Sequence, residues 1–378
     1  MTIATINVHL LESANELNSS RATTVIVTNL KEDYANLSLE SDLVKFGLKL
    51  QKEDDLNALK FIATTLTPTL DQGSSLEFYV PVGDGSQRKI VLVALPTALS
   101  RDNSPARPHA LTNVIKSVKY TGDLVVILNS ATKDIAYAQA CAVGRNFPIF
   151  TLKSTATNPT NTLHIIVNCK EKIESTFPTI VSNTIANIRS VQRLVDTPPN
   201  ILHTDAYVEE CRKVYSTLGG CSIQVIQGRD LEAAGFGGIW NVGKASEHLP
   251  ALVVLSYSPS IAIPGTKSVC LVGKGITYDT GGLSIKTPTT SMAGMKEDMA
   301  GSAAVLGAFA TLVSNDLYLS SQTDATGRLQ KPLHALLCIS ENSVGPLSTR
   351  PDDVVTFLSG KTVEVFHGYY CTAKLLTS

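Results

Sequence analysis

The sequence predicts an α/β protein with two domains, each built in three layers around a sheet. Three observations support this: a length of 378 residues, an apolar content of 43%, and short β-branched runs that alternate with segments of helical spacing. We place an N-terminal α/β domain at residues 1–175, a linking helix at 176–200 and a second α/β domain at 201–378.

The N-terminal domain shows the alternation most clearly. Its sequence predicts strands at residues 23–27, 90–95, 123–128 and 164–167, and helices at 42–50 and 131–144. The Pro/Ser-rich stretch 96–108 predicts a loop. His9, His109 and His164 are isolated in the sequence, so we expect no catalytic site in this domain.

The link and the second domain continue the pattern. Apolar residues at intervals of three and four predict a helix over 179–195, which the Pro198-Pro199 pair ends. A helix at 205–218 with Thr204 as its cap follows, then strands at 222–226, 251–257, 269–272 and 335–339. A helix from Met299 lies between the last two strands, which predicts a parallel βαβ unit.

Composition excludes several classes of function. A formal net charge of -1 argues against nucleic-acid binding. We see no apolar run of membrane-spanning length and no signal peptide, so we expect no membrane partner. The seven cysteines occur singly, which predicts reduced thiols in a cytoplasmic protein.

Charged side chains gather between residues 272 and 305, among glycines and apolar residues. Lys274 and Asp279 follow the apolar run 268–272, which we expect to be a short buried strand opened by the two glycines on either side of Lys274. Lys286 follows a glycine pair, and Asp298 directly precedes the helix of small residues. Ligands bind at the carboxyl ends of strands in open α/β sheets, so this is where a site is expected.

Two carboxylates and a lysine suit a divalent cation, provided that the lysine is neutral when it coordinates. The alternative is structural: Lys274 and Asp279 would form an ion pair, and Asp298 would be an anion at a helix start. Each residue alone favours the structural interpretation. Their density within one segment favours the metal site.

Several segments together resemble the leucyl aminopeptidase family. They are VGKGITYDTGGLSIK and MKEDMAGSAAV, with LVDTPPNILHTDAY and GFGGIWNVGKAS upstream and ENSVGPLSTRPDDVVTFLSGKTVEV downstream. They occur in the family's order over about half of the chain. The part before residue 175 resembles the family only loosely.

This resemblance implies a metal-dependent aminopeptidase that releases N-terminal amino acids from peptides by means of a metal-bridged hydroxide. Lys274, Asp279 and Asp298 would be metal ligands, with Asp279 bridging two ions of zinc or manganese. Lys286 would polarise the scissile carbonyl, and Met295 would line the pocket for the first substrate side chain. The family also implies a cytoplasmic homo-oligomer, a hexamer.

The sequence departs from the family after Val365. The family continues N-T-D-A-E-G-R-L, which supplies two further ligands and an arginine, whereas residues 366–374 here read FHGYYCTAK. We therefore expect the second domain to be incomplete at its carboxyl end, as in a splice form, a truncation or a gene-model error. The alternative function is a catalytically impaired chain that binds one metal ion or none, and that binds peptide or co-assembles with full-length subunits.

One segment imitates the missing motif. Residues 323–329 read TDATGRL, but they precede the strand at 334–340 instead of following TVEV. We interpret this segment as a surface loop with a turn at Gly327.

Overall fold

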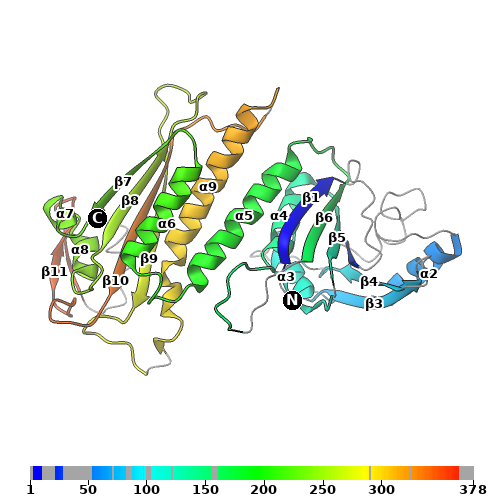
Figure 1. Cartoon of the computed structure of the whole chain (residues 1–378), viewed down its shortest axis with the longest axis horizontal. Coiled ribbons are helices and arrows are strands. Elements are labelled where there is room, and N and C mark those ends of the chain that lie inside the picture. Colours follow the sequence, from blue (N-terminus) through cyan, green and yellow to red (C-terminus); the bar gives the residue numbers. More distant parts are fainter. Residues whose placement is uncertain are drawn as a thin grey trace. The chain divides into compact units, whose positions relative to one another are not determined.

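The computed structural model describes residues 3–10, 22–28, 53–69, 72–81, 87–96, 98, 104–120, 122–154, 161–288, 291–323 and 326–365. The chain divides into two compact units, Met1–Arg189 and Ser190–Ser378. Each unit contains its own sheet with helices on both faces (Figure 1). The predicted fold class is confirmed.

The first unit contains a six-stranded sheet in the order β1-β6-β5-β2-β4-β3. Its strands are β1 (Ile3–Leu10), β2 (Thr23–Thr28), β3 (Ser74–Pro81), β4 (Gln87–Ala94), β5 (Leu124–Ser130) and β6 (Asn161–Cys169). Neighbouring strands are parallel except β3, which pairs antiparallel with β4. The central strands β2, β4 and β5 are apolar on both faces, as expected of strands covered by two helical layers.

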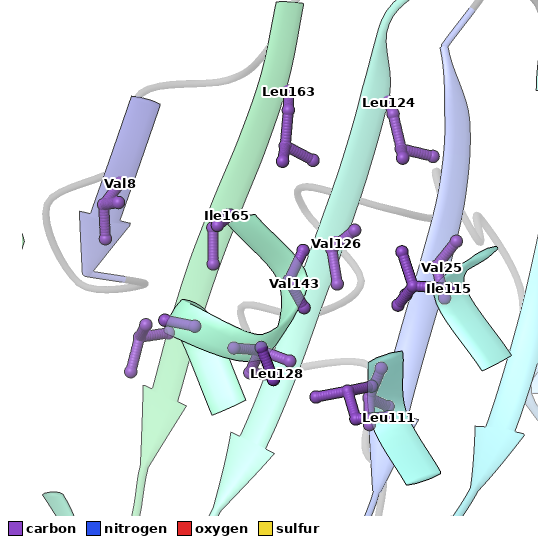
Figure 2. Packing of buried hydrophobic residues seen from close by; sticks show 14 of the residues in the cluster. Val8, Val25, Leu111, Ile115, Leu124, Val126, Leu128, Val143, Leu163 and Ile165 are labelled. Atoms are coloured by element: carbon purple, nitrogen blue, oxygen red, sulfur yellow. The ribbon is translucent and has the colours of Figure 1, made fainter. Parts of the chain in front are cut away.

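Helices cover both faces of this sheet. On one face lie α3 (Pro108–Ser117) and α4 (Lys133–Gly144), and Figure 2 shows Leu111, Ile115 and Val143 of these helices against the strand side chains Val25 and Val126. On the other face, α2 (Glu53–Thr64) contributes apolar side chains to a second cluster. The predicted three layers are therefore present.

The predicted strands and the helix at 131–144 are confirmed with small shifts of their ends. The helix predicted at 42–50 lies outside the described residues. The edge strands β1 and β3 were not predicted, because an edge strand lacks the long apolar run of a buried strand. We expected His9 and His164 to be isolated, but they are neighbours in the structure. The parallel strands β1 and β6 bring His9 Nε2 within 3.3 Å of His164 Nδ1.

The long helix α5 (Phe177–Asp196) spans the division between the units, which falls between Arg189 and Ser190. Its first half contributes Val181 and Ile185 to the core of the first unit, and its last turns contribute Leu194 to the core of the second. The domain boundaries that the sequence predicts, at 1–175, 176–200 and 201–378, remain our proposal.

The second unit contains a four-stranded sheet in the order β7-β8-β10-β9. Its strands are β7 (Cys221–Gln227), β8 (Ala251–Tyr257), β9 (Val269–Asp279) and β10 (Leu333–Asn342). β9 and β10 are parallel and joined through α9 (Ala300–Ser320), so the predicted βαβ unit is confirmed. β8 is antiparallel to both of its neighbours. A small ribbon of β11 (Val354–Thr356) and β12 (Thr362–Glu364) follows.

Two pairs of helices cover this second sheet. α6 (Thr204–Thr217) and α9 pack on one face, where Tyr207 and Phe309 are fully buried (Figure 1). α7 (Arg229–Ala233) and α8 (Gly237–Gly243) pack on the other. Thr204 was predicted to cap α6, but the cap is His203, whose Nδ1 accepts a hydrogen bond from the Ala206 backbone N–H.

Residues 295–320, which include α9, are long and apolar enough to cross a membrane by length and composition, contrary to the expectation that no segment approaches this length. The apolar side chains of this helix are nevertheless used inside the second unit. Ala303, Leu306, Phe309 and Val313 all pack into its core. The segment therefore has the properties of a core helix.

Candidate metal centre

The candidate centre is built on β9, which runs through the glycines that were predicted to end it. A Cβ added to Gly273 would lie 2.5 Å from Ser302 Cα, and one added to Gly275 would lie 2.8 Å from Cys338 O. Glycine is thus required because the start of α9 packs directly on Gly273 and the backbone of β10 lies close to Gly275. The early part of β9 is also more exposed than predicted, with Val272 42% exposed, because β9 is an edge strand among the described residues.

A bulge near the end of β9 brings Lys274 and Asp279 to the same face. They are five positions apart, so an unbroken strand would place them on opposite faces. Ile276 pairs with Ser340, however, and Asp279 with Asn342, so three steps on β9 match two on β10. The extra residue reverses the alternation beyond it.

The four predicted charged residues are brought together as two adjoining ion pairs. Lys286 Nζ lies 2.5 Å from Asp279 Oδ2, and Lys274 Nζ lies 2.9 Å from Asp298 Oδ1. Asp298 also interacts electrostatically with Asp279 and Lys286. The structural alternative paired Lys274 with Asp279, and that pairing is wrong.

Asp279 is held by three groups. Its Oδ1 accepts hydrogen bonds from Asn342 Nδ2 at 2.6 Å and from the Gly281 backbone N–H at 3.0 Å, and its Oδ2 accepts from Lys286. Both Asp279 and Lys286 are buried. We did not predict a role for Asn342. The available signal was a polar Glu341-Asn342 pair directly after an apolar strand, at the sheet edge where Asp279 also lies.

Asp298 lies in the short 3₁₀ helix η4 (Met295–Met299), immediately before α9. Burial raises the pKa of this carboxyl group, and the hydrogen bond from Lys274 opposes that rise. Its Oδ2 is buried and has no hydrogen-bond partner. Met295 is partly buried three residues earlier, where a 3₁₀ turn places two side chains on the same side.

The donor set is of a kind that suits a divalent cation. A buried carboxylate oxygen without a partner is costly unless something binds it, and a cation is the natural partner. Lys274, Asp279 and Asp298 provide three ligand-type side chains, the number that catalytic sites commonly use. Among the described residues, a second ion would have only Asp279 as a ligand, and it would share that carboxylate with the first ion.

The described residues of the imitating segment lie away from this cluster. Gly327 has a positive φ of 83°, and the Arg328 guanidinium pairs with Asp316 near the end of α9. Asp298 precedes the start of that helix, and sixteen helical residues span about 24 Å. Asp324 lies outside the described residues.

Residues 189–368 match the cytosol aminopeptidase family, catalytic domain, and residues 20–156 match the M17 aminopeptidase N-terminal domain 2. The structure of leucine aminopeptidase LAP1 from Caenorhabditis elegans is 31% identical, with a TM-score of 0.80, over 98% of this chain and 69% of that one. This chain belongs to the cytosol aminopeptidase family.

Other members of the cytosol aminopeptidase family are similar. The probable aminopeptidase NPEPL1 of Homo sapiens is 40% identical over 280 residues, which cover 72% of this chain and 50% of that protein. Leucyl aminopeptidase from Leishmania major, solved in complex with actinonin, is 28% identical with a TM-score of 0.82, over 99% of this chain and 68% of that one. The chain thus spans about half the length of the curated relatives it matches.

Proposed function

We propose that the cluster around Asp279 is the catalytic centre of a metal-dependent aminopeptidase that releases N-terminal amino acids from peptides. The observation that carries this proposal is Asp298 Oδ2, a buried oxygen atom without a hydrogen-bond partner. Asp298 also interacts electrostatically with the buried carboxylate of Asp279. Family membership adds the reaction class.

Lys274, Asp279 and Asp298 would hold the metal, with zinc or manganese as the candidates. Lys274 would have to coordinate through a neutral amine, which a neighbouring dication and partial burial both favour. When bound, divalent ions would supply the positive charge that activates water and polarises the substrate carbonyl.

Lys286 would act on the substrate itself. Its ammonium group is held against Asp279 and is only 7% exposed, so its position is restricted before any substrate arrives. With Asp279 neutralised by a cation, Lys286 would be available to donate a hydrogen bond to the scissile carbonyl oxygen. That bond would strengthen as negative charge develops on the oxygen. Met295, beside Asp298, would contact the first substrate side chain.

Peptide substrates are supported by related proteins. Leucyl aminopeptidases of Leishmania major and Trypanosoma brucei were solved with the inhibitors actinonin and bestatin. Their identities to this chain are 28% and 27%. By the same relationship we propose a cytoplasmic homo-oligomer, with the hexamer as its form.

A second candidate function follows from the ligand count. The described residues provide ligands for one ion, and residues 366–374 differ from the family's remaining ligand motif. The 378-residue chain would then bind one metal ion weakly and bind peptide, or co-assemble with full-length subunits, with little hydrolysis of its own.

The test measures Mn²⁺ binding and leucyl-amide hydrolysis by the 378-residue chain and by Asp298→Asn. Asp352→Asn is the matched control, because Asp352 is exposed and asparagine tolerates its positive φ. We expect Asp298→Asn to weaken Mn²⁺ binding roughly tenfold or more and to abolish any Mn²⁺-dependent hydrolysis. Binding without turnover in the parent chain favours the second candidate. If the parent chain shows neither Mn²⁺ binding nor turnover, both candidate functions are overturned.

A further inference from the structure

A separate group of metal-ligating side chains lies at the start of α6. His203 is the cap of this helix, Asp205 is in its first turn, and His248 comes from the loop before β8. Each offers one ligand atom, and these atoms all lie within 4.8 Å of one another. All three side chains are at least partly exposed, so an ion could reach them from water.

We propose that His203, Asp205 and His248 bind a divalent transition metal ion of the zinc class. Two imidazoles and one carboxylate are a donor set that such ions take, with water completing the coordination. The two imidazole rings stack in the metal-free structure, with centroids 3.5 Å apart and an interplanar angle of 12°, so at least one ring would turn to bring its nitrogen lone pair to the shared ion.

The metal ion would take the place of the proton that now lies between His248 and Asp205. His248 Nδ1 lies 2.7 Å from Asp205 Oδ2, where the ring donates to the carboxylate. A tautomer of His248 with its proton on Nε2 would leave Nδ1 and the carboxylate oxygen facing the same point, both as acceptors. His203 Nδ1 accepts only a long hydrogen bond of 3.4 Å from the Ala206 backbone N–H, so little is lost when it binds a cation instead.

Neighbouring groups hold this arrangement in place. Gln227 Nε2 donates to Asp205 Oδ1 at 2.6 Å and lies 3.3 Å from Leu249 O, so it ties the helix start to the loop. The Ser246 hydroxyl lies 2.8 Å from His248 O and 2.7 Å from Gly243 O. Such outer contacts orient ligands and raise metal affinity.

This cluster is distinct from the centre on β9. Gln227 pairs with Ala251, Ala251 with Ile339, and Ile339 with Gly275, in one row across the sheet. Three strand spacings separate the ends of that row, about 14 Å. The proposal therefore stands independently of the aminopeptidase function.

The test counts Zn²⁺ bound per chain by titration calorimetry on the 378-residue protein and on His248→Gln. His109→Gln is the matched control, because His109 is an exposed histidine outside the cluster. His203→Asn provides a second variant that keeps a good helix cap. Co²⁺ absorption reports the coordination of the ion directly.

We expect His248→Gln and His203→Asn each to weaken the binding of one Zn²⁺ ion per chain roughly tenfold or more. Each should also remove one set of Co²⁺ absorption bands. His109→Gln should retain the Zn²⁺ affinity and the Co²⁺ absorption bands of the parent chain. Hydrolysis of leucyl amide should not change in His248→Gln, which separates this site from the proposed catalytic centre. Equal Zn²⁺ stoichiometry and affinity in His248→Gln and the parent chain would overturn the proposal.

Discussion

Asp279 illustrates how single contacts define the candidate centre. Its Oδ2 faces Lys286, while Asn342 Nδ2 and the Gly281 N–H hold its Oδ1. A carboxylate with one oxygen fixed by neutral donors keeps its orientation when the cation beside it changes. Asn342 is therefore a positioning residue for any metal that Asp279 binds.

Replacing Asn342 with alanine should weaken Mn²⁺ binding about 10- to 100-fold, the usual effect of losing an outer contact to a metal ligand. Titration calorimetry measures this. Asn187→Ala is the control, because the amide of Asn187 bonds to a carbonyl of its own helix. Unchanged Mn²⁺ affinity in Asn342→Ala would show that Asn342 does not orient a ligand.

Asp316 is a second buried carboxylate, with a structural role. Burial by itself would raise its pKa, but hydrogen bonds from Tyr257, Arg328 and the Leu329 backbone N–H outweigh this effect, and the pKa is lowered. Tyr257 Oη donates at 2.7 Å and Leu329 N at 2.8 Å. This carboxylate ties the loop after α9 to the strand β8.

Asp316→Asn should reduce the free energy of unfolding by about 3 kcal/mol near neutral pH, as expected for breaking a buried ion pair. Because the folded pKa is below the unfolded one, the stabilisation is present above the unfolded pKa of about 3.9 and is lost as pH falls through the folded value. Urea unfolding at several pH values tests this. A difference in the free energy of unfolding between the parent chain and Asp316→Asn that stays constant down to pH 2 would contradict this expectation.

At the scale of elements, the close contact of β9 with α9 places Lys274 opposite Asp298. Gly273 faces Ser302 and Gly301 at the helix start, where even one methyl group would collide with backbone atoms. The sequence predicted the glycines as a break in the strand, because their packing partner lies about thirty residues later. Only the folded unit shows that they are packing positions.

Gly273→Ala should destabilise the chain by about 1–3 kcal/mol, the usual cost of overpacking. It should also weaken Mn²⁺ binding, since α9 must move away from Lys274. Gly219→Ala is the matched control, because its added Cβ would meet only Leu317 Cδ1, at 3.9 Å. Urea unfolding that shows equal stability for both variants would rule out this role of Gly273.

At the scale of the whole molecule, the alternation of apolar runs was sufficient to predict two α/β units, because sheets covered on both faces need strongly apolar strands such as β5. The same sequence predicted Lys274, Asp279, Lys286 and Asp298 as one site from their density. It did not predict their pairing. That depends on the bulge between β9 and β10, whose paired residues lie more than sixty positions apart.

The number of Mn²⁺ ions bound per chain, compared between the 378-residue protein and Asp279→Asn, tests the central claim most directly. We propose that Lys274, Asp279 and Asp298 together bind one ion. Asp279→Asn should therefore lose one Mn²⁺ equivalent while its circular dichroism spectrum stays unchanged. Equal Mn²⁺ binding by the two proteins would contradict the claim that this partly buried cluster is a metal centre.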